Sequence, residues 1–208
     1  MDASTFAAIL HDLATRIPGA YAATLVDREG ETVDYTGQGE PFDLKLAAAH
    51  WQIVLAECVR FTASAKLGGM RSLVVRGARR SFIIHALPEE YALIVLLRRR
   101  AGFSPIHRAI SVCERALVRE ARWTVHTAAT SHVARWFAVT VTLGRAKRPA
   151  RVASPTADHN VEVLGAVRAP HLGSRELGYR VRTYSGLEFT LIREPGGFWY
   201  ADEDVTNA

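Results

Sequence analysis

Apolar and polar positions in the first part of the chain follow the two periods of helices and strands. From residue 3 to residue 17, apolar side chains recur three or four residues apart, which predicts one apolar stripe on a helix. Pro18-Gly19 is expected to end this helix. Strand-like segments follow at 21–26 and 31–35, and the turn sequence between them contains Gly30, which can adopt a positive φ. The pattern predicts a helix followed by a β-hairpin.

The segment from about Phe42 to Ala65 is predicted to be a long helix that is apolar on nearly every side. A single narrow stripe cannot hold its large apolar side chains, which are Leu44, Leu46, Trp51, Ile53, Val54, Leu55, Val59 and Phe61. A helix of this kind is covered on more than one side. We therefore expect one side to lie on the protein's own sheet and the other to meet a second molecule.

Three further strands and a third helix complete this part of the chain. The strands are expected at 70–76, 81–87 and 91–97, and the last of them is apolar enough to lie in the middle of a sheet. Ser104-Pro105 suits the start of a helix that runs to about Trp123. The order predicts an α+β fold in which a five-stranded sheet carries helices on both faces.

The order and spacing of these segments resemble the roadblock/dynein light chain family, and within it the bacterial MglB-like proteins. The resemblance covers residues 3–122 and is carried by IPGAYAATLVDREGETVDYTG, by the apolar long helix and by GGMRSLVVRGARRSFIIHALPEEYALIVLL. It implies an α-β-β-α-β-β-β-α sandwich with an antiparallel sheet, of the roadblock/profilin-like kind. It also implies a non-enzymatic dimeric protein that regulates or localises a Ras-like small GTPase.

The strand MRSLVVR is expected at the edge of the sheet, where unpaired backbone groups can join another copy. We predict a dimer interface formed by Leu73 and Val75 of this strand and by Trp51 and Leu55 on the outer side of the long helix. The alternative is that Trp51 and Leu55 belong to the core of one protomer. The second copy is either the same protein or another roadblock protein.

The rest of the chain is expected to be rich in strands. Residues 124–160 are interpreted as one strand and a basic connector, GRAKRPARVASP, and residues 161–208 as a small β-rich module. Phe198, Trp199 and Tyr200 are consecutive, so in a strand Trp199 points to one face and its neighbours to the other. Trp199 is therefore a candidate for contact with a partner, and the alternative is that all three rings close a small core.

The third predicted helix carries arginines at a spacing that places them on one face. Arg108, Arg115, Arg119 and Arg122 are the candidates for binding an acidic partner. The alternative is a solvated face whose arginines pair locally with Glu114 and Glu120.

Composition and the absence of known motifs argue against several classes of function, namely enzymes, metal-binding proteins and membrane-spanning proteins. The 208-residue chain has a formal charge of +5 and two cysteines, both inside apolar helical patterns that suit core residues. We find no phosphate-binding loop, nucleophile elbow, zinc-protease motif or paired cysteines, and we expect no enzyme, metal or cofactor. Without a signal peptide or a run of about 18 apolar residues, the protein is expected in the cytoplasm.

Two other functions stay open at this stage. The first is binding of nucleic acid or another polyanion through the arginine-rich helix and the connector residues Arg145, Lys147, Arg148 and Arg151. The second is a small-molecule sensory domain, because the profilin-like arrangement can be opened into a ligand pocket.

Overall fold

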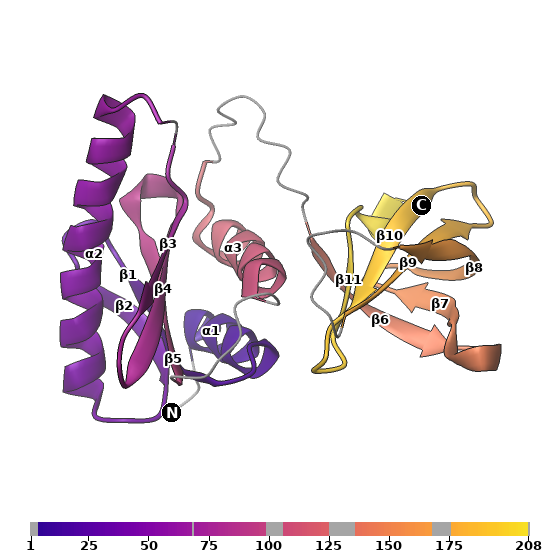
Figure 1. The fold of residues 1–208 in the computed structure, drawn as a ribbon, viewed down its shortest axis with the longest axis horizontal. Helices are drawn as coiled ribbons and strands as arrows, with labels where there is room; N and C mark the ends of the chain where they lie inside the picture. Colours follow the sequence, from indigo (N-terminus) through magenta and orange to yellow (C-terminus); the bar gives the residue numbers. More distant parts are fainter. Residues whose placement is uncertain (1–3, 68, 99–105, 125–135, 168–175, 208) are drawn as a thin grey trace. The chain divides into compact units, whose positions relative to one another are not determined.

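The computed structural model describes residues 4–67, 69–98, 106–124, 136–167 and 176–207, shown in Figure 1. The chain divides into two units. Unit 1 comprises residues 1–102 and 113–128, and unit 2 comprises residues 103–112 and 129–208. Helix α3 (Ile106–Ala121) contributes its first turns to unit 2 and the remainder to unit 1. The predicted helix start at Ser104-Pro105 lies outside the described residues.

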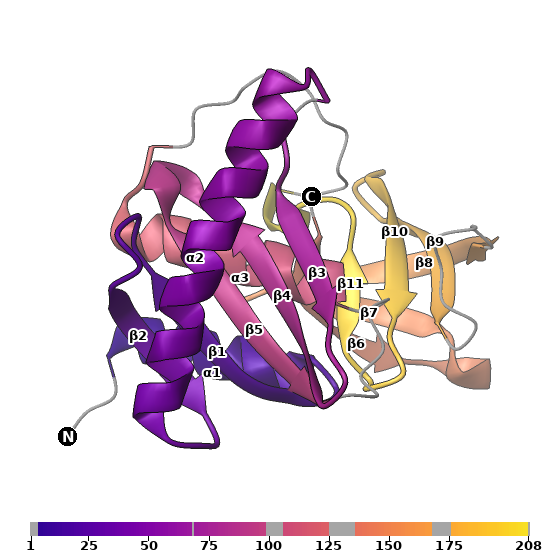
Figure 2. The same cartoon turned by 60° about the vertical axis from the view of Figure 1, so that its left-hand side comes forward.

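Unit 1 contains an antiparallel sheet of five strands in the order β2-β1-β5-β4-β3. The strands are β1 (Ala20–Val26), β2 (Thr32–Gly37), β3 (Ser72–Arg76), β4 (Arg80–Ala86) and β5 (Ala92–Arg98). Helix α2 (Pro41–Ser64) covers one face and α1 (Thr5–Arg16) the other, as Figures 1 and 2 show. A 3₁₀ turn (η1, Pro88–Glu90) joins β4 to β5. The predicted order of elements and the five-stranded antiparallel sheet are confirmed.

Local sequence explains where these elements begin and turn. The Ser4 hydroxyl accepts a hydrogen bond from the Ala7 backbone N–H at 3.0 Å and caps α1. Pro41 occupies the first turn of α2, where its missing N–H costs nothing. Gly30 has a φ of +81°, and a Cβ there would lie 3.2 Å from the Cα of Ala49 in α2. The turn between β1 and β2 therefore needs glycine both for its backbone and for its close approach to α2.

Unit 2 contains a closed barrel in which each strand pairs antiparallel with the next in the chain, and β11 pairs with β6 to close the ring. Its strands are β6 (Phe137–Leu143), β7 (Pro149–Ala153), β8 (Asp158–Val167), β9 (Leu177–Thr183), β10 (Glu188–Arg193) and β11 (Trp199–Ala201). Short 3₁₀ turns lie at Arg145–Lys147 (η2) and Val205–Asn207 (η3). The barrel core includes Val152, Val181, Phe189, Leu191 and Trp199.

The interpretation of the basic segment as a connector is wrong. Its residues form the η2 turn and strand β7, whose Val152 is fully buried in the barrel core. The expected β-rich character of the C-terminal region is confirmed, but the barrel takes strands from both sides of residue 160. Because β6 and β11 lie far apart in the sequence, the ring closes through non-local pairs such as Val139 with Trp199.

Candidate functional site

Helix α2 carries large apolar side chains on the side that faces away from the sheet. We call this surface the outer face of α2, and its residues are Phe42, Leu46, Ile53, Val54 and Phe61. The exposed fractions of Phe42, Ile53 and Phe61 are 71%, 62% and 65%. Spacings of four and seven residues place Phe42, Leu46 and Ile53 in one row. The expectation that this helix has more apolar surface than its own sheet covers holds for the described residues.

The opposite side of α2 packs on the sheet. Leu55 is only 3% exposed and belongs to a core cluster with Ile84 and Ile94. Trp51 packs against the same cluster, and its ring centroid lies 5.0 Å from that of Phe82. The placement of Trp51 and Leu55 on the outer side of the helix is therefore wrong, because Leu55 is buried in the core of one protomer and the half-buried Trp51 packs against that core. The exposed residues that the sequence analysis does not select as interface candidates are Phe42, Ile53 and Phe61.

Strand β3 is the last strand of the sheet, as predicted, and among the described residues it pairs only with β4. Leu73 and Val75 are half-buried and pack on the α2 side against the core cluster of that face. Val74 is exposed on the other side. A role for Leu73 and Val75 in an interface stays a prediction, and the open hydrogen-bonding edge of β3 is the feature that the structure adds.

A polar network lies on the other face of the sheet, at the start of β3. The Ser72 Oγ lies 2.6 Å from His85 Nδ1, and His85 Nε2 lies 3.2 Å from a carboxylate oxygen of Glu114. Arg71 donates to the second carboxylate oxygen of Glu114 at 3.3 Å. This network connects the edge strand to β4 and to the unit 1 part of α3.

The Glu114 carboxylate is held ionised by its neighbours. Burial by itself raises the pKa of Glu114, but the hydrogen bond with His85 and the charges of His85, Arg71 and Arg115 outweigh it, so that the pKa is lowered from the ordinary value of 4.5. A carboxyl group whose pKa is lower in the folded state stabilises the fold above its unfolded pKa. That contribution disappears as the pH falls through the folded pKa.

We therefore expect acid to weaken unit 1 through this carboxylate. As the pH falls below 4.5, the ordinary pKa of this carboxyl, the unmodified protein should lose stability faster than the Glu114→Gln variant, which cannot titrate there. Urea unfolding followed by circular dichroism over this pH range measures the difference. Parallel pH profiles for the two proteins would contradict the assignment.

The arginines that the spacing places on one side of α3 do not form one exposed surface. Arg108 is buried in unit 2, where one guanidinium nitrogen lies 3.0 Å from both Glu176 and Glu194 and the other lies 3.1 Å from Glu176. Its guanidinium carbon also lies 4.7 Å from the centre of the Trp136 ring. The prediction that Arg108 faces solvent and binds a partner is wrong, because carboxylates of its own unit occupy its guanidinium.

The other candidate residues differ in exposure. Arg115 is half-buried, Arg119 is exposed, and Arg122 is exposed but follows the end of α3 with a φ of +54°. Trp199 is 8% exposed and packs inside the barrel, so its proposed availability to a partner is wrong and the alternative of a core residue is correct.

The basic turn between β6 and β7 is exposed at Arg145, Lys147 and Arg148. Arg151 follows in β7 and forms an ion pair with Asp158 at 2.5 Å.

Several His, Cys, Asp and Glu side chains that could bind a metal ion lie among the described residues. Among them, no three His, Cys, Asp or Glu side chains are grouped closely enough to hold a metal ion. Cys113 is buried, and burial raises the pKa of its thiol, which makes the reactive thiolate scarce. Within the same residues, no helix combines the length and apolar character needed to cross a membrane.

Comparisons with known proteins identify the fold of one part of the chain. No protein-family model matches the sequence, and no curated protein matches it. Among solved structures, a Roadblock/LC7 domain from Streptomyces avermitilis is 18% identical with a TM-score of 0.50, and the match covers 56% of this chain and 97% of that one. Myxococcus xanthus MglB is 16% identical with a TM-score of 0.53, with 59% of this chain and 98% of that one covered.

A third structure, titled "MglB with tetrameric arrangement", is 16% identical with a TM-score of 0.52, and the match covers 59% of this chain and 93% of that one. At these identities the likeness concerns the fold. The resemblance drawn from the sequence is confirmed at that level, and the chain contains a roadblock-like fold over somewhat more than half of its length.

Proposed function

We propose that this protein is a self-associating platform that binds a Ras-like small GTPase and regulates or localises it. One observation supports the proposal above all others, namely that the roadblock-like fold leaves the outer face of α2 exposed in the same unit as the open edge of β3. Apolar patches of this kind usually mark protein contacts.

Self-association accounts for both features together. Pairing of β3 with β3 of a second copy would satisfy the edge hydrogen bonds and continue the sheet from one protomer into the next. A related fold is known in a tetrameric arrangement, which supports the proposal that roadblock-like chains associate. The residues proposed for the contact are therefore the backbone of β3, with Leu73 and Val75, and the outer face of α2, in place of Trp51 and Leu55.

Two features support a GTPase as the partner: the likeness of fold to MglB, and exposed arginine side chains on unit 1. Arg119 and Arg122 remain candidates for contact with an acidic partner surface, because both are exposed. A regulator of a GTPase must bind its two nucleotide states with different affinities, since equal affinities shift no equilibrium.

The test uses the full chain and purified Ras-like GTPases loaded with GDP or with a non-hydrolysable GTP analogue. We expect at least about 10-fold tighter binding to one nucleotide state, equivalent to about 1.4 kcal/mol, measured by calorimetry. The double variant Arg119→Gln, Arg122→Gln should weaken binding, and Arg145→Gln, Arg148→Gln is the control with the same change in charge. Equal affinity for both states, with an unchanged rate of GTP hydrolysis, would contradict the regulatory function.

A further inference from the structure

Exposed arginines gather at one end of the unit 1 sheet. We call Arg79, Arg80 and Arg98 the arginine cluster, and all three are exposed. Arg80 begins β4, Arg98 ends β5, and Arg79 lies in the turn that precedes β4. In the sequence, segments 76–80 and 98–100 together hold six arginines and neither a lysine nor an acidic residue.

The sheet places two of these positive charges directly opposite each other. Arg80 and Arg98 are register partners in the antiparallel pair of β4 and β5, so their side chains leave the same face of the sheet. Like charges at opposed positions destabilise a sheet. Among the described residues, no carboxylate forms an ion pair with any member of the arginine cluster. The fold therefore holds an uncompensated concentration of guanidinium groups.

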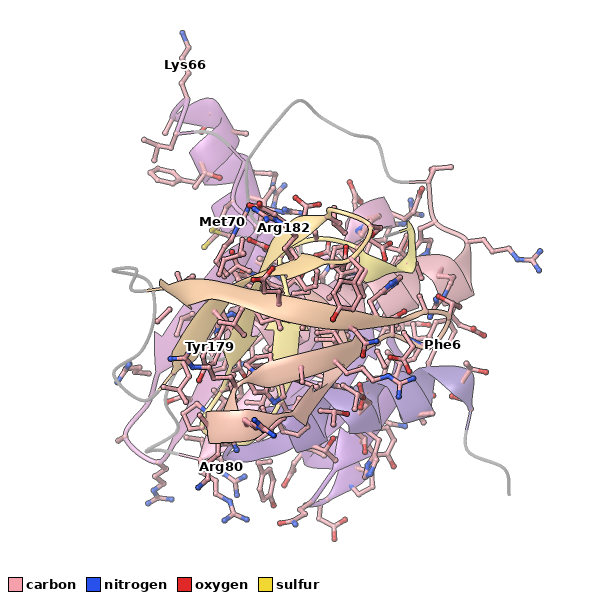
Figure 3. All side chains as sticks on the ribbon, turned by 90° about the vertical axis from the view of Figure 1, so that its right-hand side faces the viewer. Phe6, Lys66, Met70, Arg80, Tyr179 and Arg182 are labelled. Carbon is pink, nitrogen blue, oxygen red and sulfur yellow. The ribbon has the colours of Figure 1, made fainter. Side chains whose placement is uncertain are left out.

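An aromatic ring orients one of these groups. The guanidinium carbon of Arg80 lies 3.9 Å from the centre of the Tyr21 ring. A contact with the ring face leaves the N–H groups around the edge of the guanidinium available to an anion. Figure 3 shows the Arg80 side chain projecting outward from the ribbon. Arg80 is thus partly fixed before any ligand arrives, which lowers the entropy cost of binding.

The residue types indicate the kind of anion. Arginine, unlike lysine, presents a planar fork that pairs with a carboxylate or a phosphate through two parallel hydrogen bonds. The Tyr21 ring is covered by Arg80, so it is not a platform for the base stacking that single-stranded nucleic acids require. The turn residues beside the cluster, Gly77 and Ala78, offer no large apolar side chain for insertion into a lipid surface.

We propose that the arginine cluster is a docking site for an acidic segment of a partner protein, bound through paired guanidinium and carboxylate groups. The site lies in unit 1 and does not depend on the GTPase function proposed above.

The experiment measures the fluorescence anisotropy of a labelled peptide of alternating Glu and Gly added to the full chain. The double variant Arg80→Gln, Arg98→Gln is expected to bind at least about 10-fold more weakly. The control, Arg145→Gln with Arg148→Gln, removes the same charge from the exposed turn of unit 2 and should change affinity by less than about 2-fold. Equal losses in the two double variants, or no binding by the unmodified chain, would overturn the proposal.

Two further arms separate the docking site from general electrostatic attraction and from a structural role. The double variant Arg80→Lys, Arg98→Lys keeps both positive charges but lacks the planar guanidinium groups. We expect it to bind the peptide about 5-fold more weakly. Unchanged affinity in that variant would overturn bidentate recognition.

Arg98→Gln tests a structural role. It should not lower the melting temperature of the protein, because it removes a like-charged neighbour of Arg80. An oligonucleotide or a phosphatidylserine vesicle that binds more tightly than the peptide through the same two arginines would also overturn the proposal.

Discussion

Replacing Arg108 by alanine is expected to destabilise unit 2 by about 3–5 kcal/mol, the cost typical of removing one partner from a buried ion pair. The guanidinium pairs with two carboxylates, and the side chains of Glu176 and Glu194 are each only 1% exposed. Without the Arg108 guanidinium, the buried carboxylates of Glu176 and Glu194 lose the cation that they share, and water cannot replace it there. Urea unfolding followed by tryptophan fluorescence measures the change, because Trp136 and Trp199 belong to this unit.

The control for this prediction lies on the same helix. Arg119→Ala removes the same kind of side chain from an exposed position of α3 and should change the unfolding free energy by less than about 0.5 kcal/mol. A loss below about 1 kcal/mol for Arg108→Ala would contradict the buried ion cluster.

Introducing a carboxylate at Ile53 is expected to weaken self-association by at least about 100-fold. Ile53 is exposed at the middle of the outer face of α2, and burying such a side chain contributes about 1.5–3 kcal/mol. A glutamate at this position loses that contribution and also places an unpaired charge in an apolar contact. The Ile53→Glu variant should retain its fold because the position faces away from the core. A dilution series by sedimentation velocity measures the dissociation constant.

Val33→Glu is the matched control for Ile53→Glu. Val33 is 43% exposed and lies in β2, the strand at the opposite edge of the sheet from β3. The same added charge at that edge should leave the dissociation constant within about 2-fold of the unmodified protein. If both variants dissociate equally, or if neither does, the outer face of α2 is not the contact surface.

Local patterns were sufficient to predict the order of elements in unit 1. The turn at Gly30, the proline and glycine that follow α1 and the apolar run of β5 each constrain only a few residues, yet together they permit one order of elements. The sheet is antiparallel and its neighbours are joined largely by short connections, so the pattern along the chain is close to the pattern in space.

The orientation of α2 could not be predicted in the same way. Its two sides both carry large apolar residues, and the side that faces the sheet includes the small Ala48 and the polar Gln52. Gln52 is buried and donates a hydrogen bond to the Glu90 carbonyl at 2.8 Å, so a polar residue marks the core side of the helix. Hydrophobicity therefore favours neither side of α2, and it does not identify Trp51 and Leu55 as residues of the side that packs on the sheet.

The structure of unit 2 depends on contacts between residues far apart in the sequence, which local patterns do not predict. Closure of the barrel requires β6 to pair with β11, and the short strand β7 begins at a proline and contains two alanines. The spacing of Arg108 on α3 suggested an exposed position, but the carboxylates that pair with it lie 68 and 86 residues further along the chain. Spacing along one helix carries no information about such partners.

We propose that a second roadblock-like protomer covers the outer face of α2 and the edge of β3. Sedimentation equilibrium of the unmodified full chain at micromolar concentration tests it most directly. We predict a particle of twice the 22.9 kDa chain mass, or a higher multiple of it. A particle of 22.9 kDa at every concentration would contradict self-association.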